Sequence, residues 1–234
     1  MGHMKVFVGT LECGEEDFQQ CIKAISLQEN VVVTHHVINN LPEKEAHNKL
    51  WAAWRIAKQD HDVFVKIDAD TVLKTNTTLT TICELFKDNS RLTGIQAYLH
   101  DHLTSDLIYG LNCFSKKVIF NDTTDELYCD RKIDTGHDIV LRGNQLPSTL
   151  IPAADHCKFA SKKQAFHYGV HRALKNQKDI YEKVCNAVKL EYSDARYFAK
   201  KGFECASLFI EHKKFNYNDN EFNELFEKAL KNEI

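Results

Sequence analysis

The sequence predicts an α/β fold, with a mostly parallel, mixed sheet, helices on both faces and a helical extension at the C-terminus. Short apolar runs alternate with amphipathic segments from the amino terminus onward, which is the pattern of a βαβαβ series. The last third of the chain has helical patterns, few glycines and no proline. We therefore expect a sheet domain over residues 4–175 and a helical extension packed on it over residues 176–234.

The βαβαβ series occupies the first part of the chain. Lys5–Gly9, Val31–Val37 and Val63–Ile67 are short and rich in β-branched residues, so each is predicted to be a strand. Between them, apolar residues recur at helical spacing in Phe18–Ile25 and again in Ala46–Ala57. Two helices are therefore expected, each connecting one strand to the next.

The second half of the predicted sheet domain is less regular. The pattern indicates a helix over Leu79–Phe86 and strands at Gly94–Tyr98 and Leu107–Phe114. The segment Gly136–Arg142 has an acidic residue near the first turn of an expected helix. A final strand is expected at Thr149–Pro152.

The C-terminal segments are predicted to be helices. Their apolar residues have mixed periodicity near Tyr181–Val188, Tyr192–Phe209 and Phe222–Leu230. Helices of this kind pack on a sheet domain or associate with a second copy, so we expect either packing or a homo-oligomer formed through them.

Composition and charge narrow the class of protein. The chain has 234 residues, 43% hydrophobic and 27% charged, which is ordinary for a globular protein. The formal net charge of −3 gives no electrostatic basis for binding nucleic acid. No apolar run approaches the roughly 18 residues of a membrane span, and no signal peptide opens the chain. We expect a cytoplasmic protein with no transmembrane segment, and Met1-Gly-His-Met4 resembles a cloning remnant.

The eight cysteines are scattered along the chain. They form no Cys-x-x-Cys pair, and no secretion signal precedes them. They are therefore expected to remain thiols without a catalytic role.

Two carboxylates, Asp68 and Asp70, follow the apolar run Val63–Ile67 directly. Such a pair repels itself at neutral pH unless a proton or a cation lies between the two groups. The carboxyl end of a buried strand is also where open α/β sheets bind ligands. We therefore predict a site for Mg²⁺ or Mn²⁺ and favour it over a solvated turn, where aspartates are also common. His100 and His102 form a second polar group, for which a solvated loop is the favoured interpretation over a metal site.

Two enzyme classes carry Asp-x-Asp after a strand. Asp68-Ala-Asp70-Thr-Val-Leu73 matches the motif of haloacid-dehalogenase-like phosphatases, where the first aspartate would be a nucleophile and the second a general acid and base. That motif normally follows the first strand of its domain, whereas two βα units precede it here. A non-enzymatic module that binds a structural metal is a further alternative.

Residues 4 to about 172 resemble the GT-A-fold, nucleotide-sugar-dependent glycosyltransferases. In that family two βα units precede an Asp-x-Asp that holds a metal on the donor's diphosphate, which is the order found here. The resemblance implies transfer of a sugar from a nucleoside-diphosphate donor to a hydroxyl of an acceptor such as a glycan. A UDP-linked sugar is the favoured donor. The resemblance also implies Mn²⁺ or Mg²⁺ as the cofactor.

The resemblance implies roles for particular residues near the metal. Asp70 would bind the cation directly, and Asp68 would contact the ribose or reach the cation through water. His156 falls where many members present a further metal ligand, and His167 is the reserve ligand. His167 and His171 are also spaced to share one face of a helix.

The remaining implied residues bind the nucleotide or move a proton. Thr10 and Glu12, after the first strand, would contact the base and the ribose. Arg172 is a candidate for contact with phosphate, and Lys66 for contact with phosphate or an aspartate. Asp138 is similar to the aspartate of the family's x-Glu-Asp base motif, with His137 in place of the glutamate.

The base assignment has substitutes. Asp134 and Asp130 lie a few residues before Asp138. If no carboxylate stands on the acceptor side, a retaining mechanism replaces the inverting one.

Overall fold

A computed structural model describes residues 3–130, 134–206 and 219–233. The chain forms two compact units, the first within residues 1–100 and 107–156, the second within residues 101–106 and 157–234. The predicted boundary at residue 175 follows the change in sequence pattern, whereas the chain leaves the first unit between His156 and Cys157.

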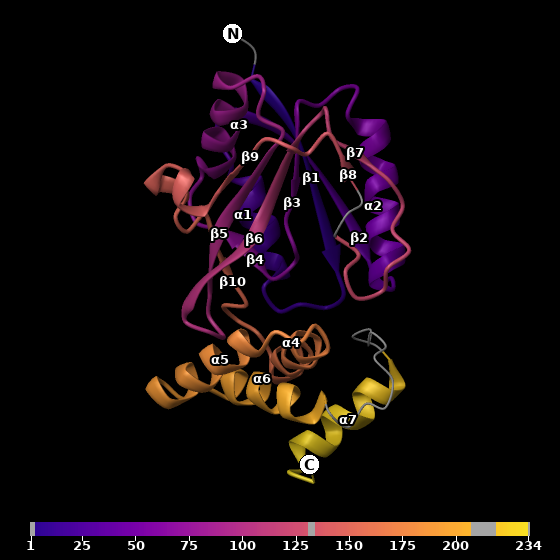
Figure 1. The fold of residues 1–234 in the computed structure, drawn as a ribbon, viewed down its shortest axis with the longest axis vertical. Coiled ribbons are helices and arrows are strands. Elements are labelled where there is room, and N and C mark those ends of the chain that lie inside the picture. Colours follow the sequence, from indigo (N-terminus) through magenta and orange to yellow (C-terminus); the bar gives the residue numbers. More distant parts are fainter. Residues whose placement is uncertain (1–2, 131–133, 207–218, 234) are drawn as a thin grey trace. The chain divides into compact units, whose positions relative to one another are not determined.

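The first unit is an α/β structure (Figure 1). The predicted strands and helices between Lys5 and Phe114 are all present, and the short strand β4 is an addition to them. The elements are β1 (Met4–Glu12), α1 (Phe18–Ser26), β2 (Val31–Asn39), α2 (Glu43–Ala57), β3 (Val63–Lys66), β4 (Thr71–Leu73), α3 (Thr78–Asp88), β5 (Gly94–Asp101), β6 (Asp106–Ser115), β7 (Ile119–Phe120), β8 (Asp134–Thr135), β9 (Val140–Arg142) and β10 (Ala154–His156).

Strand alternation divides the apolar side chains between the two faces of the sheet. Val6 and Val8 belong to a buried cluster that includes side chains of α1 and α3. Phe7 and Phe64 point the other way and belong to a second cluster with Trp51 and other side chains of α2. Figure 1 shows α2 on one side of the sheet and α1 and α3 on the other. The prediction of helices on both faces is therefore confirmed.

The main sheet is mixed. Its strand order is β2-β1-β3-β6-β5-β10-β4, with β9 paired to β5. β1 is parallel to β2 and β3, and β5 is parallel to β9, whereas β6 is antiparallel to β3 and β10 is antiparallel to β4. The connection from β5 to β6 is a tight hairpin, so β5 runs in the direction of β3. The carboxyl ends of β1, β3 and β5 therefore meet at one edge.

The helix expected to begin in Gly136–Arg142 is a wrong prediction, because the segment contains β9. Val140 pairs with Gly94 of β5. Ile139, just before the strand, donates its amide to Thr93 Oγ1 and accepts a hydrogen bond from the Thr93 amide at its carbonyl. Pairing with a distant strand outweighs the local signal of an acidic residue at a helix start.

The strand expected at Thr149–Pro152 is also a wrong prediction. A 3-10 turn, Ser148–Leu150, occupies this segment. It lies between Pro147 and Pro152, and a proline has no amide hydrogen to donate to a neighbouring strand. The strand follows two residues after the second proline, as β10.

The second unit contains the predicted helical tail, of which the last three residues of the segment Tyr192–Phe209 lie outside the described residues. Its helices are α4 (Lys162–Leu174), α5 (Lys178–Leu190), α6 (Asp194–Cys205) and α7 (Asn220–Leu230). α4 and α6 approach closely at two glycines: a Cβ on Gly169 would lie 2.0 Å from the carbonyl oxygen of Ala199, and one on Gly202 would lie 2.1 Å from that of Phe166. Glycine is therefore required for this helix contact.

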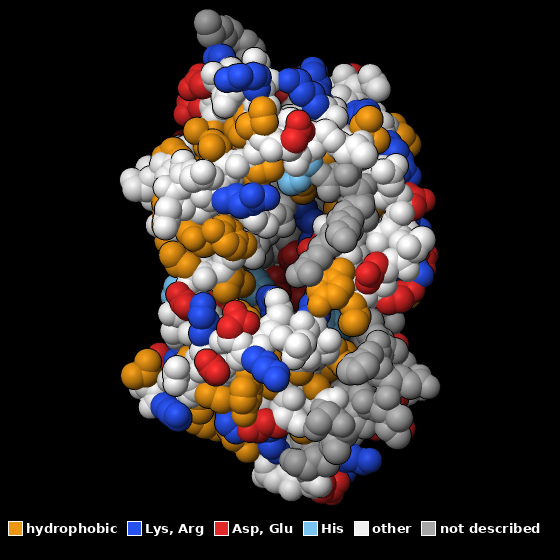
Figure 2. All heavy atoms as spheres, in the orientation of Figure 1, with side chains coloured by type: hydrophobic (Ala, Val, Ile, Leu, Met, Phe, Trp, Pro, Cys, Tyr) orange, Lys and Arg blue, Asp and Glu red, His pale blue; other side chains and the backbone are white. Residues whose placement is uncertain are grey.

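Charged side chains of both signs are interspersed on the face drawn in Figure 2, in keeping with the small net charge of −3. Within the described ranges, none of the helices combines the length and the apolar character that crossing a membrane requires.

Candidate functional site

Asp68 and Asp70 leave the sheet where β3 ends. Their neighbours Ile67 and Ala69 are buried, so the chain alternates between core and edge at this point. The amide of Thr71 donates to the carbonyl of Asp68 at 2.9 Å, which closes a turn around the pair. The backbone therefore holds both carboxylates at the carboxyl edge of the parallel strands.

His156 lies beside Asp70. In the antiparallel pair of β10 and β4, His156 is opposite Thr71, the residue after Asp70. Its Nε2 is 3.4 Å from Asp70 Oδ2, and the histidine is 9% exposed. Two adjacent ligands of an octahedral Mg²⁺ or Mn²⁺, each about 2.1 Å from the ion, are about 3.0 Å apart. A shift of a few tenths of an ångström would therefore let both atoms bind one cation.

Glu15 is a third acidic residue at this edge, and the sequence analysis did not identify it. It lies in the loop between β1 and α1, where its carboxylate accepts a hydrogen bond of 2.7 Å from the amide of Cys13. Burial, and then the negative charge of Asp70, raise the pKa of the Glu15 carboxyl to about 7. A carboxyl that keeps its proton near neutral pH would lose it to an approaching cation. Glu15 is therefore a candidate ligand beside Asp70.

Lys66 supplies a buried positive charge. It is 7% exposed, and its ammonium forms an ion pair with Asp68 Oδ1. Burial acts to lower the pKa of Lys66, but the charges of Asp68, Asp130 and Asp70 outweigh it and raise the pKa above its ordinary value. Lys66 therefore stays charged, and it engages Asp68 while His156 faces Asp70.

Cys21 is a buried thiol close to the aspartate pair. Cys21 Sγ donates to the carbonyl of Asp68 at 3.8 Å. Burial, and then the charges of Asp70 and Asp68, raise the pKa of Cys21 to about 12, so it remains a thiol. All eight cysteines of the chain are free, as predicted.

Thr10 and Glu12 stand at the end of β1, at the same edge of the sheet. Thr10 is fully buried, and its hydroxyl is 2.9 Å from Nε2 of His35. The carboxylate of Glu12 accepts a hydrogen bond of 2.6 Å from the amide of Gly14. These contacts fix both side chains, and their expected roles toward a base and a ribose stay predictions.

Of the predicted bases, Asp138 is not brought to the aspartate pair. Asp138 is exposed in the loop before β9, and β9 pairs with the beginning of β5, whereas Asp68 follows the end of β3. Because β3 and β5 run in the same direction, Asp138 and Asp68 lie toward opposite ends of the strands. Asp134 lies in β8 and pairs through its backbone with Phe120. Asp130 is closer to the pair, since its negative charge contributes to raising the pKa of Lys66 beside Asp68.

Comparison with known proteins does not identify this geometry. No family model and no curated protein matches the chain. Its chemistry must therefore be argued from the groups at this edge of the sheet, which are three carboxyls, an imidazole and a buried ammonium.

His167 and Arg172 belong to the second unit, on α4. The rings of His167 and His171 have their centroids 4.0 Å apart, which confirms that the two histidines share a helix face. The guanidinium of Arg172 lies over the ring of Tyr168, 4.8 Å from its centroid, and donates to Gln177 Oε1 at 3.0 Å. The predicted roles of His167 as a metal ligand and of Arg172 as a phosphate contact stay predictions.

The two histidines expected in a solvated loop belong to different units. His100 lies near the end of β5, with Nδ1 3.6 Å from Asp155 Oδ1 of β10. His102 lies in the second unit, where its carbonyl accepts a hydrogen bond of 3.0 Å from Arg196 Nε. The segment is thus the end of a strand followed by a hairpin turn, and is more ordered than a solvated loop.

Proposed function

We propose that this chain is a metal-dependent glycosyltransferase that moves a sugar from a nucleoside-diphosphate donor to an acceptor hydroxyl. The observation that carries the proposal is the 3.4 Å separation of His156 Nε2 and Asp70 Oδ2, at the edge where parallel strands end. The order of two βα units, a strand and then an acidic pair adds support, since it resembles that of the GT-A-fold enzymes.

The residues at the edge fit a hard divalent cation. Asp70 and His156 would hold Mn²⁺ or Mg²⁺ directly, with Glu15 as a third candidate, and Asp68 would contact the cation through water or bind the ribose. When bound, the cation would stabilise the negative charge that develops on the departing diphosphate.

Lys66 forms an ion pair with Asp68 and orients its carboxylate. Its buried ammonium beside the carboxylate also limits the negative charge that a diphosphate would meet at this edge. Thr10 and Glu12 are the candidates for binding the base and the ribose of the donor, because they end the strand next to β3.

The acceptor hydroxyl must lose a proton to a base within hydrogen-bond reach. Asp138 lies toward the other end of the strands, so it is not assigned this role. Asp130 is better placed, because its charge is felt by Lys66 beside Asp68. A glycan is the expected acceptor class, by resemblance to the family.

The test is a screen of donors with the purified chain. UDP-, GDP- and ADP-linked hexoses are each incubated with Mn²⁺, and release of the nucleoside diphosphate is measured with and without a panel of oligosaccharides. We expect one donor to be turned over, and EDTA to abolish the turnover. Asp70→Asn should lower the rate at least about 100-fold, because it removes a direct ligand.

Asp60→Asn is the matched control, since Asp60 is an exposed aspartate in the turn that follows α2. It should leave the rate unchanged. Turnover of a phosphomonoester without release of a nucleoside diphosphate would favour the phosphatase and overturn the proposal. A structural metal module would instead be indicated by two results together: the chain binds metal but no donor changes its thermal unfolding, and Asp70→Asn loses its fold.

A further inference from the structure

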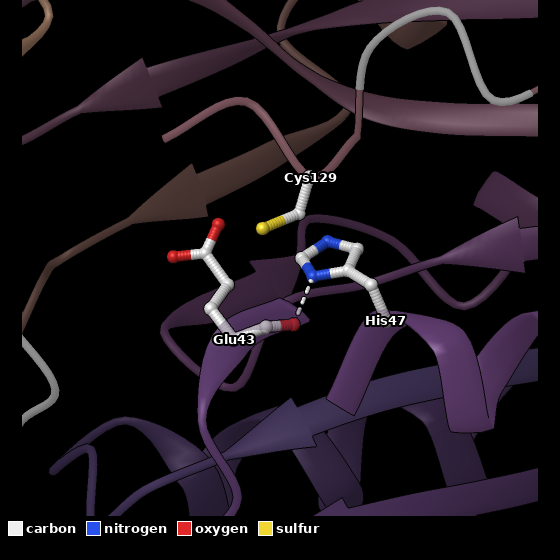
Figure 3. A group of neighbouring side chains, drawn as sticks. All are labelled: Glu43, His47 and Cys129. Carbon is white, nitrogen blue, oxygen red and sulfur yellow. Dashed lines mark hydrogen bonds between the residues drawn. The ribbon is translucent and has the colours of Figure 1, made fainter. Parts of the chain in front are cut away.

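A second group of metal-binding side chains lies on α2, apart from the aspartate pair. Glu43 and His47 are four residues apart and share one face of the helix, and Cys129 reaches them from the loop after β7. One ligand atom from each residue lies within 4.8 Å of the other two. Figure 3 shows the sulfur of Cys129, the ring of His47 and the carboxylate of Glu43 turned toward one another.

The hydrogen bond of His47 determines which nitrogen can bind a metal. Nδ1 is 2.8 Å from the backbone carbonyl of Glu43 (Figure 3). A carbonyl only accepts, so Nδ1 carries the proton and Nε2 of the neutral ring has the lone pair. A hydrogen bond from one ring nitrogen to a carbonyl is the usual way in which proteins orient a metal-binding histidine. His47 therefore has the tautomer and the support of a ligand.

The loop that carries Cys129 is attached to α2 independently of the cysteine. The side chain of Asn48 exchanges two hydrogen bonds with the backbone of Thr123, of 2.8 and 3.1 Å. Arg55 donates to Asp122 Oδ1 at 3.0 and 3.1 Å. The ligands on the loop and on the helix are thus held near each other before any ion binds, which reduces the cost of forming a site.

Burial separates two of the three side chains from water. Cys129 is fully buried, and His47 is 3% exposed. The thiol of Cys129 donates to the carbonyls of Asp125 and Glu126 at 3.3 and 3.4 Å. On binding a metal it would release its proton to solvent and become a thiolate.

We propose that Glu43, His47 and Cys129 form a zinc site that fastens the loop of residues 122–129 to α2. Thiolate and imidazole are ligands that favour Zn²⁺ over Mg²⁺ or Mn²⁺, and a thiolate with a carboxylate balances the charge of the ion. Neighbouring ligands in a tetrahedral zinc site are about 3.3–3.7 Å apart, which small side-chain rotations would reach from the observed spacing. Water completes the four ligands.

The position of this site gives it a structural role. The loop continues from Cys129 to Asp130, whose charge acts on Lys66 beside the aspartate pair. Zinc would therefore fix the approach of this loop to the carboxyl edge of the sheet. The inference does not depend on the proposed function, because its readouts are metal content and spectra.

The test begins with the metal-free chain and Co²⁺, which replaces zinc and has visible bands. We expect one Co²⁺ per chain to produce the absorption of a tetrahedral site together with a thiolate-to-cobalt charge-transfer band, and one equivalent of Zn²⁺ to bleach both. Zinc should also raise the midpoint of thermal unfolding. Glu43→Gln, at the partly exposed start of α2, should weaken binding at least about 10-fold without unfolding the chain.

Matched variants assign the band. Cys129→Ala should abolish it, whereas Cys83→Ala, which removes a similarly buried thiol on α3, should retain it. Asp70→Asn should retain it as well, which separates this site from the aspartate pair. Absence of a charge-transfer band in the unaltered chain, or its persistence in Cys129→Ala, would overturn the inference.

Discussion

Replacing Glu15 with glutamine should make the metal-free chain more stable at alkaline pH. The carboxyl of Glu15 has a pKa of about 7 in the folded chain, against an ordinary value of 4.5, because it is buried and lies near the charge of Asp70. The folded state therefore holds a proton that the unfolded chain has already lost between these two pH values. Stability falls as the pH rises through this range, and glutamine removes the dependence.

The size of the effect follows from the shift. Moving the pKa from 4.5 to about 7 corresponds to a cost of about 3 kcal/mol above pH 7, at roughly 1.4 kcal/mol per unit. Glu15 retains some contact with solvent, so about half of this value is the working expectation. A difference of about 1.5 kcal/mol corresponds to roughly 3–6 °C in a chain of this length.

The assay is thermal or urea unfolding of the unaltered chain and of Glu15→Gln at pH 5, 6, 7 and 8 in EDTA. The advantage of the variant should be smallest at pH 5 and greatest at pH 8. Glu16→Gln, an exposed neighbour, is the control and should show no such trend. Calorimetry with Mn²⁺ gives a second measurement: a half-protonated Glu15 that binds the ion releases about 0.5 proton per ion at pH 7 and about 0.1 at pH 8.

Equal stability of the unaltered chain and Glu15→Gln at every pH would refute the reasoning about burial. Glu15→Gln could instead be more stable at alkaline pH and still bind Mn²⁺ with unchanged affinity and proton release. The argument from burial would then stand, but Glu15 would not be a ligand of the metal.

Three further predictions concern charge and packing. Lys66→Met should lower the free energy of unfolding at pH 7 by about 2 kcal/mol in urea, because it leaves Asp68 without its buried partner; an unchanged value would mean that the ion pair contributes nothing. Gly169→Ala should lower the free energy of unfolding by about 2 kcal/mol or more, because α4 and α6 leave no room for the Cβ. Helix propensity alone predicts the opposite, a rise of about 1 kcal/mol. A measured rise would show that α4 and α6 do not approach as closely as described. Burial, and then the charge of His36, lower the pKa of His35 below its ordinary value of 6.5, so the free energy of unfolding should fall as the pH falls below that value. His35→Asn should flatten this part of the curve of stability against pH. A curve like that of the unaltered chain would contradict the lowered pKa of His35.

The first part of the fold could be predicted because local pattern and tertiary environment agree there. Val63–Ile67 is apolar at every position except Lys66, and the structure buries the whole run between helices on both faces. The same run determines where Asp68 and Asp70 leave the sheet. Sequence alone was therefore sufficient to locate the acidic pair at a strand end.

Glu15 could not be chosen from the sequence. Three glutamates, at positions 12, 15 and 16, lie at the end of β1 and in the loop after it, and their order along the chain does not indicate which one is buried. The choice depends on the distance to Asp70, which lies more than fifty residues away in the chain. The signal available was only that acidic residues are frequent in this loop.

The helix expected to begin near Asp138 is wrong for a related reason. The sequence around it has an acidic residue where a helix could begin, and the family resemblance added a role to that position. The β-branched residues Ile139 and Val140 favour a strand, however, and Thr93 of a distant segment pairs with Ile139 through three hydrogen bonds. A single acidic residue at a possible helix start stabilises a helix less than this pairing stabilises the strand.

His156 lies beside Asp70, although the strand that the sequence predicts before it, at Thr149–Pro152, is not present. The two residues are brought together by β4 and β10, strands of only three residues each, so few backbone hydrogen bonds hold the separation of 3.4 Å. The fully buried Ala153 and Ala154, with Leu73 on the opposite strand, supply the remaining support. The geometry of the site therefore depends on the packing of small side chains beneath it, which a search for ligand motifs does not examine.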